Sequence, residues 1–196
     1  MKKIPSLFVR DFGHDPRLVL PQLTPGCEWV LNGEGVATRK RDGTCCMVDD
    51  SGRLWRRYDA KGGKTPPDGF VPAQAEPDKN TGHWPGWVLV GDGPQDKWYY
   101  SAVWPTLPGT YELCGPKFQT NAEGLAQHRF FRHGEEVLWT GLMFGCRSHG
   151  NSDEAFVALR SDFQVLTMEG VVWHHPDGRL CKLKRSDFGY QWPVRA

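Results

Sequence analysis

Short apolar segments alternate with Gly- and Pro-containing turns along most of this chain, and this feature restricts the fold more than any other. The sequence contains 23 Gly and 15 Pro, together with nine Trp and ten Phe. Gly and Pro favour turns, and aromatic side chains favour the pleated surface of a strand. The pattern therefore predicts a β-rich chain with many short strands. Its 196 residues suffice for one sizeable domain with an apolar core, and two small domains are the alternative.

The charge and hydropathy of the chain exclude several classes of protein. The formal net charge is +1, from 24 Lys and Arg against 23 Asp and Glu, so any basic surface for nucleic acid must be local. No run of about 18 apolar residues is present, which predicts no membrane span and no membrane partner. The apolar run near the N-terminus is too short for a secretory signal. We therefore expect a cytoplasmic protein.

The cysteines do not follow a known metal or disulfide pattern. None of the six forms a C-x-x-C pair, and two of them are adjacent, which is poor geometry for a disulfide between them. This spacing disfavours a structural zinc site and a secreted disulfide framework. We expect reduced and mostly buried thiols. The six are Cys27, Cys45, Cys46, Cys114, Cys146 and Cys181.

The first half of the chain predicts a series of strands and turns. Residues 28–60 have the pattern of strand, tight turn, strand, hairpin turn and strand, with Asp-Ser-Gly at 50–52 forming the hairpin turn. Residues 61–87 are rich in Pro and Gly and too long for a simple connection, so we expect a functional or mobile loop. Further strands are predicted at 96–104 and 109–115.

The second half of the chain predicts one helix and a closing hairpin. The helix spans 152–163, with Ser152 as its N-cap and acidic residues in its first turn. Four residues fall at positions i, i+3, i+4 and i+7 of one helical face, namely Phe156, Leu159, Arg160 and Phe163. The apolar segments 168–175 and 179–185 flank a Pro-Asp-Gly turn and predict a hairpin.

Charged residues inside apolar strand segments are informative, because a strand buries charge only at a cost. Lys40 precedes an Asp-Gly turn, Glu112 lies within one predicted strand, and Glu169 opens another. Lys182 and Lys184 alternate with apolar residues, so both point to one face of their strand. If these strands share a cleft, the two carboxylates and three lysines can bind a polyphosphate and a metal ion.

Lys40 stands between Arg39 and Arg41, which suggests a nucleophilic amine. Neighbouring cations and partial desolvation lower the pKa of a lysine, and only the deprotonated amine attacks. Strand alternation points the two arginines away from Lys40, so Lys182 and Lys184 are expected to be its effective neighbours. Taken singly, each feature has an ordinary explanation, namely a K-x-D-G hairpin turn, a polar edge strand or a solvated K-x-K face. Their order and spacing favour a site.

Four short motifs in this order resemble the covalent nucleotidyltransferase superfamily of RNA ligases, DNA ligases and mRNA capping enzymes. In that comparison KRDG resembles motif I, YELCG motif III, EGVV motif IV and CKLKR motif V. Six segments between about residues 36 and 193 resemble one branch, the 5′-to-3′ RNA ligase family first recognised in vertebrates. These segments are ATRKRDGTCC, LWRRYDAK, GHWPGWV, TYELCG, EGVVWHHPDG and KLKRSDFGYQWP.

The resemblance implies a fold, a cofactor and a reaction. The fold would be α+β, an ATP-grasp-like nucleotidyltransferase domain with antiparallel sheets and a few flanking helices, spanning residues 1–196 as a single domain. The enzyme would use ATP and Mg²⁺, with Mn²⁺ as an alternative ion, and would act as a monomer. It would join an RNA 5′-phosphate end to an RNA 3′-hydroxyl end through a lysyl-AMP intermediate and an adenylylated RNA 5′ end.

The resemblance also implies a role for each matching residue. Lys40 would attack the α-phosphate of ATP, and Asp42 and Gly43 would shape the turn that presents it. Lys182 and Lys184 would hold the α-phosphate through both chemical steps. The residues implied to bind the nucleotide and the metal ion are Arg57 and Glu112 for the ribose, Lys61 for a phosphate, Phe131 or Phe130 for the base, and Glu169 with Glu112 for the metal ion.

The chain departs from the family pattern at two places. Many relatives carry an acid before the nucleophile that accepts from the adenine amino group, and Arg39 cannot accept through its side chain. The chain ends at Ala196, soon after motif V, which predicts no accessory C-terminal domain and leaves RNA contact to this domain. The basic residues that are candidates for that contact are Lys61, Lys64, Arg129, Arg132, His133, Arg147 and Arg185.

Three other functions fit part of the same pattern. A GTP-dependent guanylyltransferase of the mRNA capping type shares the motif I chemistry but fits GHWPGWV and DFGYQWP less well. A ligase of DNA nicks fits for the same reason, and the missing C-terminal module weighs against it. A non-catalytic nucleotide- or RNA-binding protein would need Lys40 only for its charge, so Lys40→Arg would leave its function intact.

Overall fold

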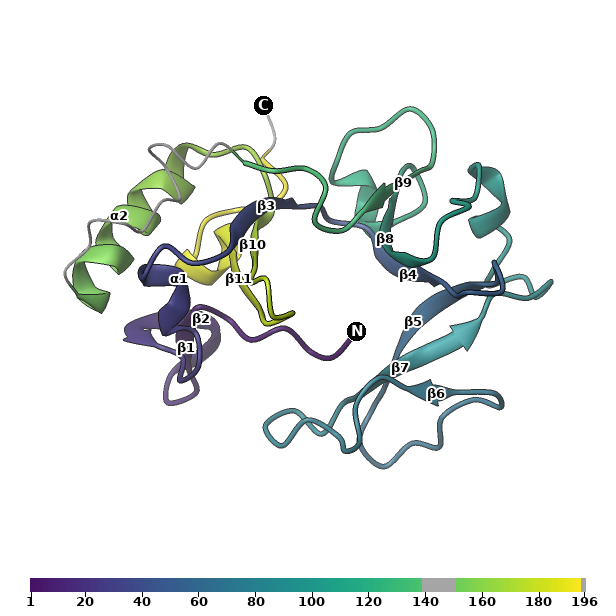
Figure 1. Cartoon of the computed structure of the whole chain (residues 1–196), viewed down its shortest axis with the longest axis horizontal. Coiled ribbons are helices and arrows are strands. Elements are labelled where there is room, and N and C mark those ends of the chain that lie inside the picture. The colour runs from purple at the N-terminus through teal and green to yellow at the C-terminus, as the bar shows by residue number, and fades with distance from the viewer. Residues whose placement is uncertain (139–150, 195–196) are drawn as a thin grey trace. The chain divides into compact units, whose positions relative to one another are not determined.

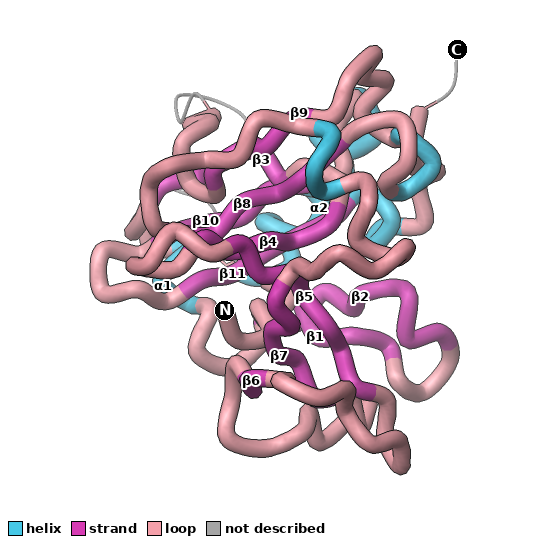
Figure 2. Tube along the Cα trace, turned by 90° about the vertical axis from the view of Figure 1, so that its right-hand side faces the viewer, coloured by secondary structure: helices cyan, strands magenta, loops and turns pink. Residues whose placement is uncertain are grey.

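The computed structural model describes residues 1–138 and 151–194. The chain divides into two units, each assembled from segments that are distant in the sequence. Unit 1 comprises Met1–Lys3 and Asp42–His133, and unit 2 comprises Ile4–Arg41 and Gly134–Ala196. Strands and loops make up most of the trace in Figure 2, and both sheets with three or more strands are antiparallel. Among the described helices, none has the length and apolar character that crossing a membrane requires.

Unit 2 is built on a three-stranded sheet in the order β11-β10-β3 (Figure 1). These strands are β3 (Val36–Lys40), β10 (Gly170–His174) and β11 (Leu180–Lys184). β10 and β11 confirm the predicted closing hairpin. β3, from the first quarter of the chain, completes the sheet by pairing with the other edge of β10.

The remaining elements of unit 2 surround an apolar core on one face of this sheet. They are β1 (Phe8–Asp11), β2 (Asp15–Leu23), α1 (Glu28–Leu31), α2 (Ser152–Val165) and the 3₁₀ helix η3 (Arg185–Phe188). The core combines side chains from the strands, the hairpin and α2, among them Phe8, Leu159, Phe163, Val171 and Leu183. All five are at most 2% exposed, so they form a well-buried core on one face of the sheet.

α2 confirms the predicted helix, but its N-cap is one residue earlier than expected. The side chain of Asn151 accepts a hydrogen bond from the amide of Glu154 at 3.0 Å. Ser152, the predicted cap, is instead the first helical residue. Asn and Ser cap about equally well, so the sequence alone could not rank these two neighbours.

The buried face of α2 differs from the predicted one at a single position. Leu159 and Phe163 are buried, and Phe156 packs against the core from a half-buried position. Arg160 is exposed, and Ala155 is buried in its place on the core face. The helical spacing alone allowed either Ala155 or Arg160 on the buried face. Charged side chains are almost never fully buried unless they are paired, so the alanine is the buried residue.

Unit 1 contains a six-stranded sheet in the order β6-β7-β5-β4-β8-β9 (Figure 1). Its strands are β4 (Thr44–Val48), β5 (Leu54–Ala60), β6 (Val71–Pro72), β7 (Trp84–Leu89), β8 (Gly109–Cys114) and β9 (Arg129–Arg132). Two 3₁₀ helices, η1 (Tyr99–Ser101) and η2 (Gln119–Asn121), lie in its connections. A second apolar core covers one face of this sheet and includes Cys46, Val48, Leu54, Tyr111 and Leu113.

The strands predicted within residues 43–60 are confirmed as β4 and β5. The strand predicted from residue 28 is wrong in its first part, because Glu28–Leu31 forms the helix α1 and β3 begins only at Val36; β3 also joins a different sheet. β4 and β5 form the expected hairpin, and Gly52 takes the positive φ of +75° in its turn. β3 does not pair with β4, because it belongs to the three-stranded sheet of unit 2. The Asp-Gly turn after Lys40 therefore connects two sheets rather than two strands of a hairpin.

Two predictions for unit 1 are wrong. Residues 96–104 do not form a strand, since Tyr99–Ser101 is a 3₁₀ helix. Buried Asp96 accepts from the amide of Gly91 at 2.9 Å and pairs with Arg56 at 2.8 Å, which bends the chain here. The predicted long loop 61–87 is also interrupted, because β6 and the first residues of β7 lie inside it.

The burial of the described cysteines agrees with the expectation of mostly buried thiols. Within the described ranges, Cys27, Cys46, Cys114 and Cys181 are buried and Cys45 is half-buried. Cys146 lies outside the described residues. Cys45 thus differs from its sequence neighbour Cys46, and the reason is strand alternation, which places the two on opposite faces of the sheet.

Candidate active site

Three lysines share one face of the sheet in unit 2. Lys40 of β3 and Lys184 of β11 both lie opposite Gly170 of β10, and Lys182 lies opposite Val172. Residues paired directly across strands point to the same face, and so do residues two apart on one strand. We name this the lysine face. It is opposite the face that packs on the core of unit 2.

Gly170 is the residue between Lys40 and Lys184 in this register. A Cβ atom at Gly170 would lie 2.3 Å from the carbonyl oxygen of Leu183, so a larger residue would force β10 and β11 apart. The close approach explains why glycine stands at this position. It also means that β10 contributes no side chain between the two lysines.

Lys40 is paired with Glu169, the residue immediately before β10. The ammonium of Lys40 donates to Oε2 of Glu169, and its Nζ is 3.4 Å from the carbonyl oxygen of Arg41. Glu169 is buried, with 8% of its surface exposed. A buried carboxylate requires a partner of opposite charge, and Lys40 supplies it.

The surroundings of Lys182 disfavour its charged form. Burial and the charges of Lys40 and Lys184 lower its pKa to about 8, and the opposing effect of Asp187 is smaller. A lysine with this pKa has an appreciable neutral fraction at mildly alkaline pH. The three lysines therefore form one electrostatically coupled group rather than three separate surface charges.

Asp187 and Arg10 support the lysine face, and sequence reasoning did not select either. Asp187 is 1% exposed and accepts from Arg10 at 2.9 Å and from the backbone amide of Lys184 at 2.8 Å. These contacts hold the end of β11, which carries Lys182 and Lys184. An acid three residues after a strand gives no sequence signal of this role, because its partner Arg10 is 177 positions away.

Arg39 and Arg41 bind a common carboxylate rather than a site on the lysine face. Arg39 is 3.5 Å and Arg41 is 2.7 Å from the carboxylate of Glu136. Arg39 pairs with Val171, whose side chain points into the core, so Arg39 is on the opposite face from Lys40. As expected from strand alternation, Arg39 and Lys40 therefore point to opposite faces of the sheet. The charge of Lys40 instead lowers the pKa of Lys182.

In unit 1, the predicted ribose and base contacts share one face of the six-stranded sheet. Glu112 lies opposite Cys45 of β4 and opposite Phe131 of β9. Arg57 of β5 has its guanidinium 5.8 Å from the ring centre of Trp87 and donates to Asp59 at 2.8 Å. This face is opposite the core of unit 1, and the guanidinium of Arg57 on it also donates to the carbonyl oxygen of Met1 at 2.5 Å.

Phe130 and Phe131, the two candidates for base stacking, are separated by strand alternation. Phe130 packs against the core of unit 1, with its ring centre 6.4 Å from that of Tyr111. Phe131 is on the face that carries Glu112, and the guanidinium of Arg129 lies 5.0 Å from its ring centre. Phe131 thus stays the candidate for stacking on a base.

Backbone amides anchor the Asp42–Gly43 turn to two carboxylates. The amide of Asp42 donates to Glu123 at 3.1 Å, and the amide of Gly43 donates to Glu112 at 3.0 Å. A Cβ atom at Gly43 would lie 2.3 Å from the carbonyl oxygen of Leu113, so this turn requires glycine. Glu123, which sequence reasoning missed, is therefore part of the turn that follows Lys40.

The predicted site residues fall into two groups, one in each unit. Unit 2 contains Lys40, Glu169, Lys182 and Lys184, and unit 1 contains Asp42, Gly43, Arg57, Lys61, Glu112 and Phe131. Lys61 is exposed at the end of β5. The boundary between the units follows Arg41, so the KRDG segment contributes Lys40 to one unit and its turn to the other.

The basic residues considered for RNA contact have different environments. Lys61 and Lys64 are exposed. Arg185 donates to backbone carbonyls at the end of α2, including that of Leu166 at 2.6 Å, so it has a structural role. Arg132 donates to the carbonyl of Pro108 at 3.2 Å. Arg147 lies outside the described residues.

Comparison with known proteins identifies a group of relatives. The chain is similar to proteins named RNA ligase 1. The protein of that name from Mus musculus is 26% identical over an aligned length of 272 residues, which covers 98% of this chain and 82% of the mouse protein. The proteins from Rattus norvegicus and Pongo abelii are 26% and 25% identical, each over 276 residues with the same coverage. No family model matches the chain. The similarity supports the relation to RNA ligases expected from the motifs.

Proposed function

We propose that this chain is an ATP-dependent RNA ligase that joins a 5′-phosphate end to a 3′-hydroxyl end through a lysyl-AMP on Lys40. The observation that carries the proposal is the lysine face, where Lys40, Lys182 and Lys184 gather beside Glu169 in a chain similar to RNA ligase 1 proteins along 98% of its length. The proposal includes an ATP-grasp-like nucleotidyltransferase fold, with which the mixed architecture of antiparallel sheets and few helices is compatible.

In the first step, the neutral amine of Lys40 attacks the α-phosphorus of ATP. A bond forms between Nζ and phosphorus, the bond from phosphorus to the bridging oxygen breaks, and pyrophosphate leaves. Lys40 must lose its proton before it attacks, and Oε2 of Glu169 is the acceptor already in contact with it. The positive charges of Lys182 and Lys184 oppose a third ammonium on this face, which favours the loss.

Lys182 and Lys184 then bind the phosphate on which negative charge develops. Fixed cations on a partly buried surface stabilise such charge more than they would in water. In the second step, an oxygen of the RNA 5′-phosphate displaces Lys40 from the adenylyl phosphorus. In the third, the 3′-hydroxyl oxygen attacks the RNA phosphate and AMP leaves.

The residues of unit 2 suit a Mg²⁺ ion that binds together with the nucleotide phosphates, rather than one that is bound by protein ligands alone. Mg²⁺ binds proteins through one or two carboxylates together with substrate phosphates and waters, and it lowers the charge on those phosphates. Glu169 offers one buried carboxylate for this purpose. Glu112 belongs to unit 1, and its two oxygens contact Gly43 and His133, so we assign it to the ribose first.

The choice of ATP over GTP comes from the resemblance and not from Arg39. Arg39 pairs with Glu136 on the face opposite Lys40, so its side chain does not take the place of the acid that accepts from adenine in relatives. We place adenine on Phe131, which shares a face with Glu112. A monomeric state and a cytoplasmic location are part of the same proposal.

Transfer of label from α-labelled ATP to the denatured protein tests the proposal. We expect an acid-labile adduct in the presence of Mg²⁺, its loss in Lys40→Ala and in Lys40→Arg, and its retention in Arg39→Gln, the adjacent residue on the opposite face. An adduct that persists in Lys40→Ala would contradict the assignment of the nucleophile. An adduct with GTP alone would favour guanylyl transfer, and sealing of DNA but not RNA strands would favour a DNA ligase.

A further inference from the structure

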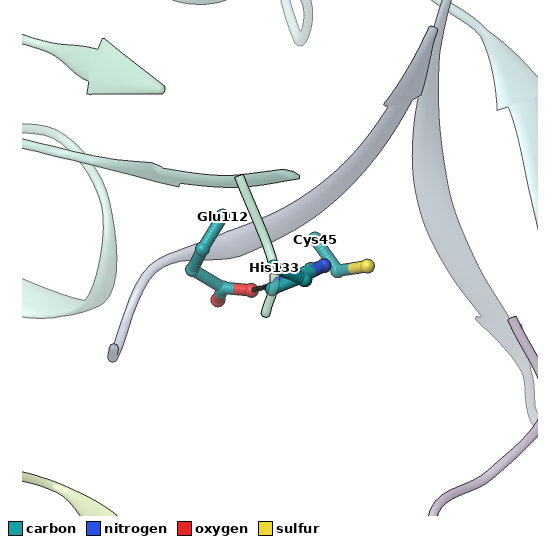
Figure 3. A group of neighbouring side chains, drawn as sticks. All are labelled: Cys45, Glu112 and His133. Atoms are coloured by element: carbon teal, nitrogen blue, oxygen red, sulfur yellow. Dashed lines mark hydrogen bonds and ion pairs between the residues drawn. The ribbon is translucent and has the colours of Figure 1, made fainter. Parts of the chain in front are cut away.

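Cys45, Glu112 and His133 lie together on the face of the unit 1 sheet that is opposite its core (Figure 3). Cys45 of β4 and Glu112 of β8 are directly paired across their strands. His133 directly follows β9, and its amide donates to the carbonyl of Thr110 at 3.1 Å. One donor atom from each of the three side chains lies within 4.8 Å of the other two, and all three residues are half-buried.

Two of these side chains are already oriented by contacts outside the cluster. Nδ1 of His133 is 3.0 Å from the hydroxyl of Thr110, and Nε2 is 3.0 Å from Oε2 of Glu112. The other carboxylate oxygen of Glu112 accepts from the amide of Gly43 at 3.0 Å. In the tautomer with a proton on Nδ1, the Thr110 hydroxyl accepts from Nδ1–H and Nε2 has a lone pair for a metal ion. Nε2 then has no hydrogen to donate to Glu112, so a bound ion would take the place of that hydrogen bond. Metal-binding histidines and carboxylates have outer partners of this kind.

The chemistry of the three donors selects the kind of ion. Thiolate and imidazole suit zinc-class ions, whereas Mg²⁺ and Ca²⁺ prefer oxygen ligands only. Zinc bonds of about 2.0–2.3 Å to nitrogen, oxygen and sulfur require the donor atoms to draw slightly inward from their present separation. A thiolate and a carboxylate together neutralise a divalent ion. Three protein ligands leave the fourth tetrahedral position to water or another oxygen, as in zinc sites with an exchangeable ligand.

We propose that Cys45, Glu112 and His133 form a binding site for one zinc-class divalent ion with an open fourth position. The site is assembled from β4, β8 and the residue that follows β9, so the absence of C-x-x-C spacing does not bear on it. One consequence rests on the proposed function: since Glu112 is assigned to the ribose, an ion held by its carboxylate would compete with the nucleotide.

Titration of the metal-free full chain with Co²⁺ tests the site, because a cobalt–thiolate bond gives an intense charge-transfer absorption band. We expect the band to saturate at one equivalent. Cys45→Ser should lose the band, and His133→Gln should weaken Co²⁺ binding tenfold or more. Thr110→Val removes only the outer partner of His133, so we expect it to keep the band and weaken binding by about 10–100-fold.

Cys46→Ala is the matched control, because Cys46 is the adjacent residue on the core face. It should retain the band. Absence of a band in the wild type, or its persistence in Cys45→Ser, would overturn the site. Thermal melting of each variant without metal distinguishes a lost ligand from a lost fold, and Thr110→Val provides a test that spares all three ligands.

The competition is tested separately from the site. Stoichiometric Zn²⁺ should reduce the transfer of label from ATP in the wild type and leave transfer in Cys45→Ser unchanged. Equal inhibition of the two proteins would overturn the competition. Because Co²⁺ binding is measured without nucleotide, failure of the ligase proposal would leave the absorption band intact, and failure of the metal site would leave label transfer intact.

Discussion

Lys40 and Glu169 form an ion pair between β3 and the residue that precedes β10. Their side chains are 22% and 11% exposed, so the pair is largely shielded from water. The two residues are 129 positions apart, and only the pairing of β3 with β10 brings them together. The pair connects the proposed nucleophile to the carboxylate that we propose as the first acceptor of its proton.

We expect Glu169→Gln to lower the free energy of unfolding by about 1.5–3 kcal/mol, because a hydrogen bond between charged groups contributes about that much. Lys40→Met should lower the free energy of unfolding less in the Glu169→Gln protein than in the wild type, because the partner of Lys40 is already neutral there. Chemical denaturation of both single variants and the double variant measures the coupling. Costs that add within about 0.3 kcal/mol would show that the pair does not stabilise the fold.

Lys182→Met is expected to stabilise the protein at neutral pH. The pKa of Lys182 is lowered from 10.5 to about 8 in the folded chain, so its protonated form is destabilised there. At pH 7 this penalty is fully present and amounts to about 3 kcal/mol, at about 1.4 kcal/mol per pKa unit. Between pH 8 and 10.5 the unfolded chain binds more protons, so wild-type stability rises and the advantage of the variant disappears.

Urea denaturation of Lys182→Met and the wild type at pH 7 and pH 10 checks this prediction. Lys64→Met is the control, because Lys64 is exposed. Its difference from the wild type should not change with pH. If the difference in free energy of unfolding between Lys182→Met and the wild type is the same at both pH values, the pKa of Lys182 is not lowered.

Gly170→Ala should destabilise the three-stranded sheet by about 1–3 kcal/mol, the usual cost of forcing extra volume into a packed site. The added methyl would meet the carbonyl of Leu183 at 2.3 Å, and β11 would have to shift together with Lys182 and Lys184. The transfer of label from ATP should therefore fall by more than the loss of folded protein accounts for. Gly13→Ala, whose nearest contact is 3.5 Å, should change neither melting temperature nor label transfer. Equal melting temperatures for the two variants would refute the close approach.

Cys45 should react with iodoacetamide at least tenfold faster than Cys46. Burial, followed by the charges of Cys45 and Glu112, raises the pKa of the Cys46 thiol well above its usual value, so the thiolate is scarce at pH 8. Cys45 is half-buried on the opposite face. Fragment-ion mass spectrometry assigns the modified residue, and Cys46→Ala and Cys45→Ala are the controls that each remove one of the two adjacent thiols. Rapid labelling of Cys46 in folded Cys45→Ala would contradict its burial.

The sequence by itself determined most local structure in this protein. Period-two alternation correctly predicted β4, β5, β8 and the β10–β11 hairpin, because alternating burial is a property of neighbouring residues. The same alternation predicted that Lys182 and Lys184 share a face. It failed at residues 96–104, where the contact of Asp96 with Arg56 outweighed an aromatic pattern typical of strands.

Only the tertiary structure decided which distant strands pair, and with that the composition of each site. The pairing of β3 with β10 places Lys40 beside Glu169, and the pairing of β4 with β8 places Cys45 beside Glu112. The spacing of the charged residues along the chain favours a site but does not specify which strands pair, because loops of many lengths connect the same two strands at similar entropic cost. The His133 contact with Glu112 appears only when β9 takes its place in the sheet.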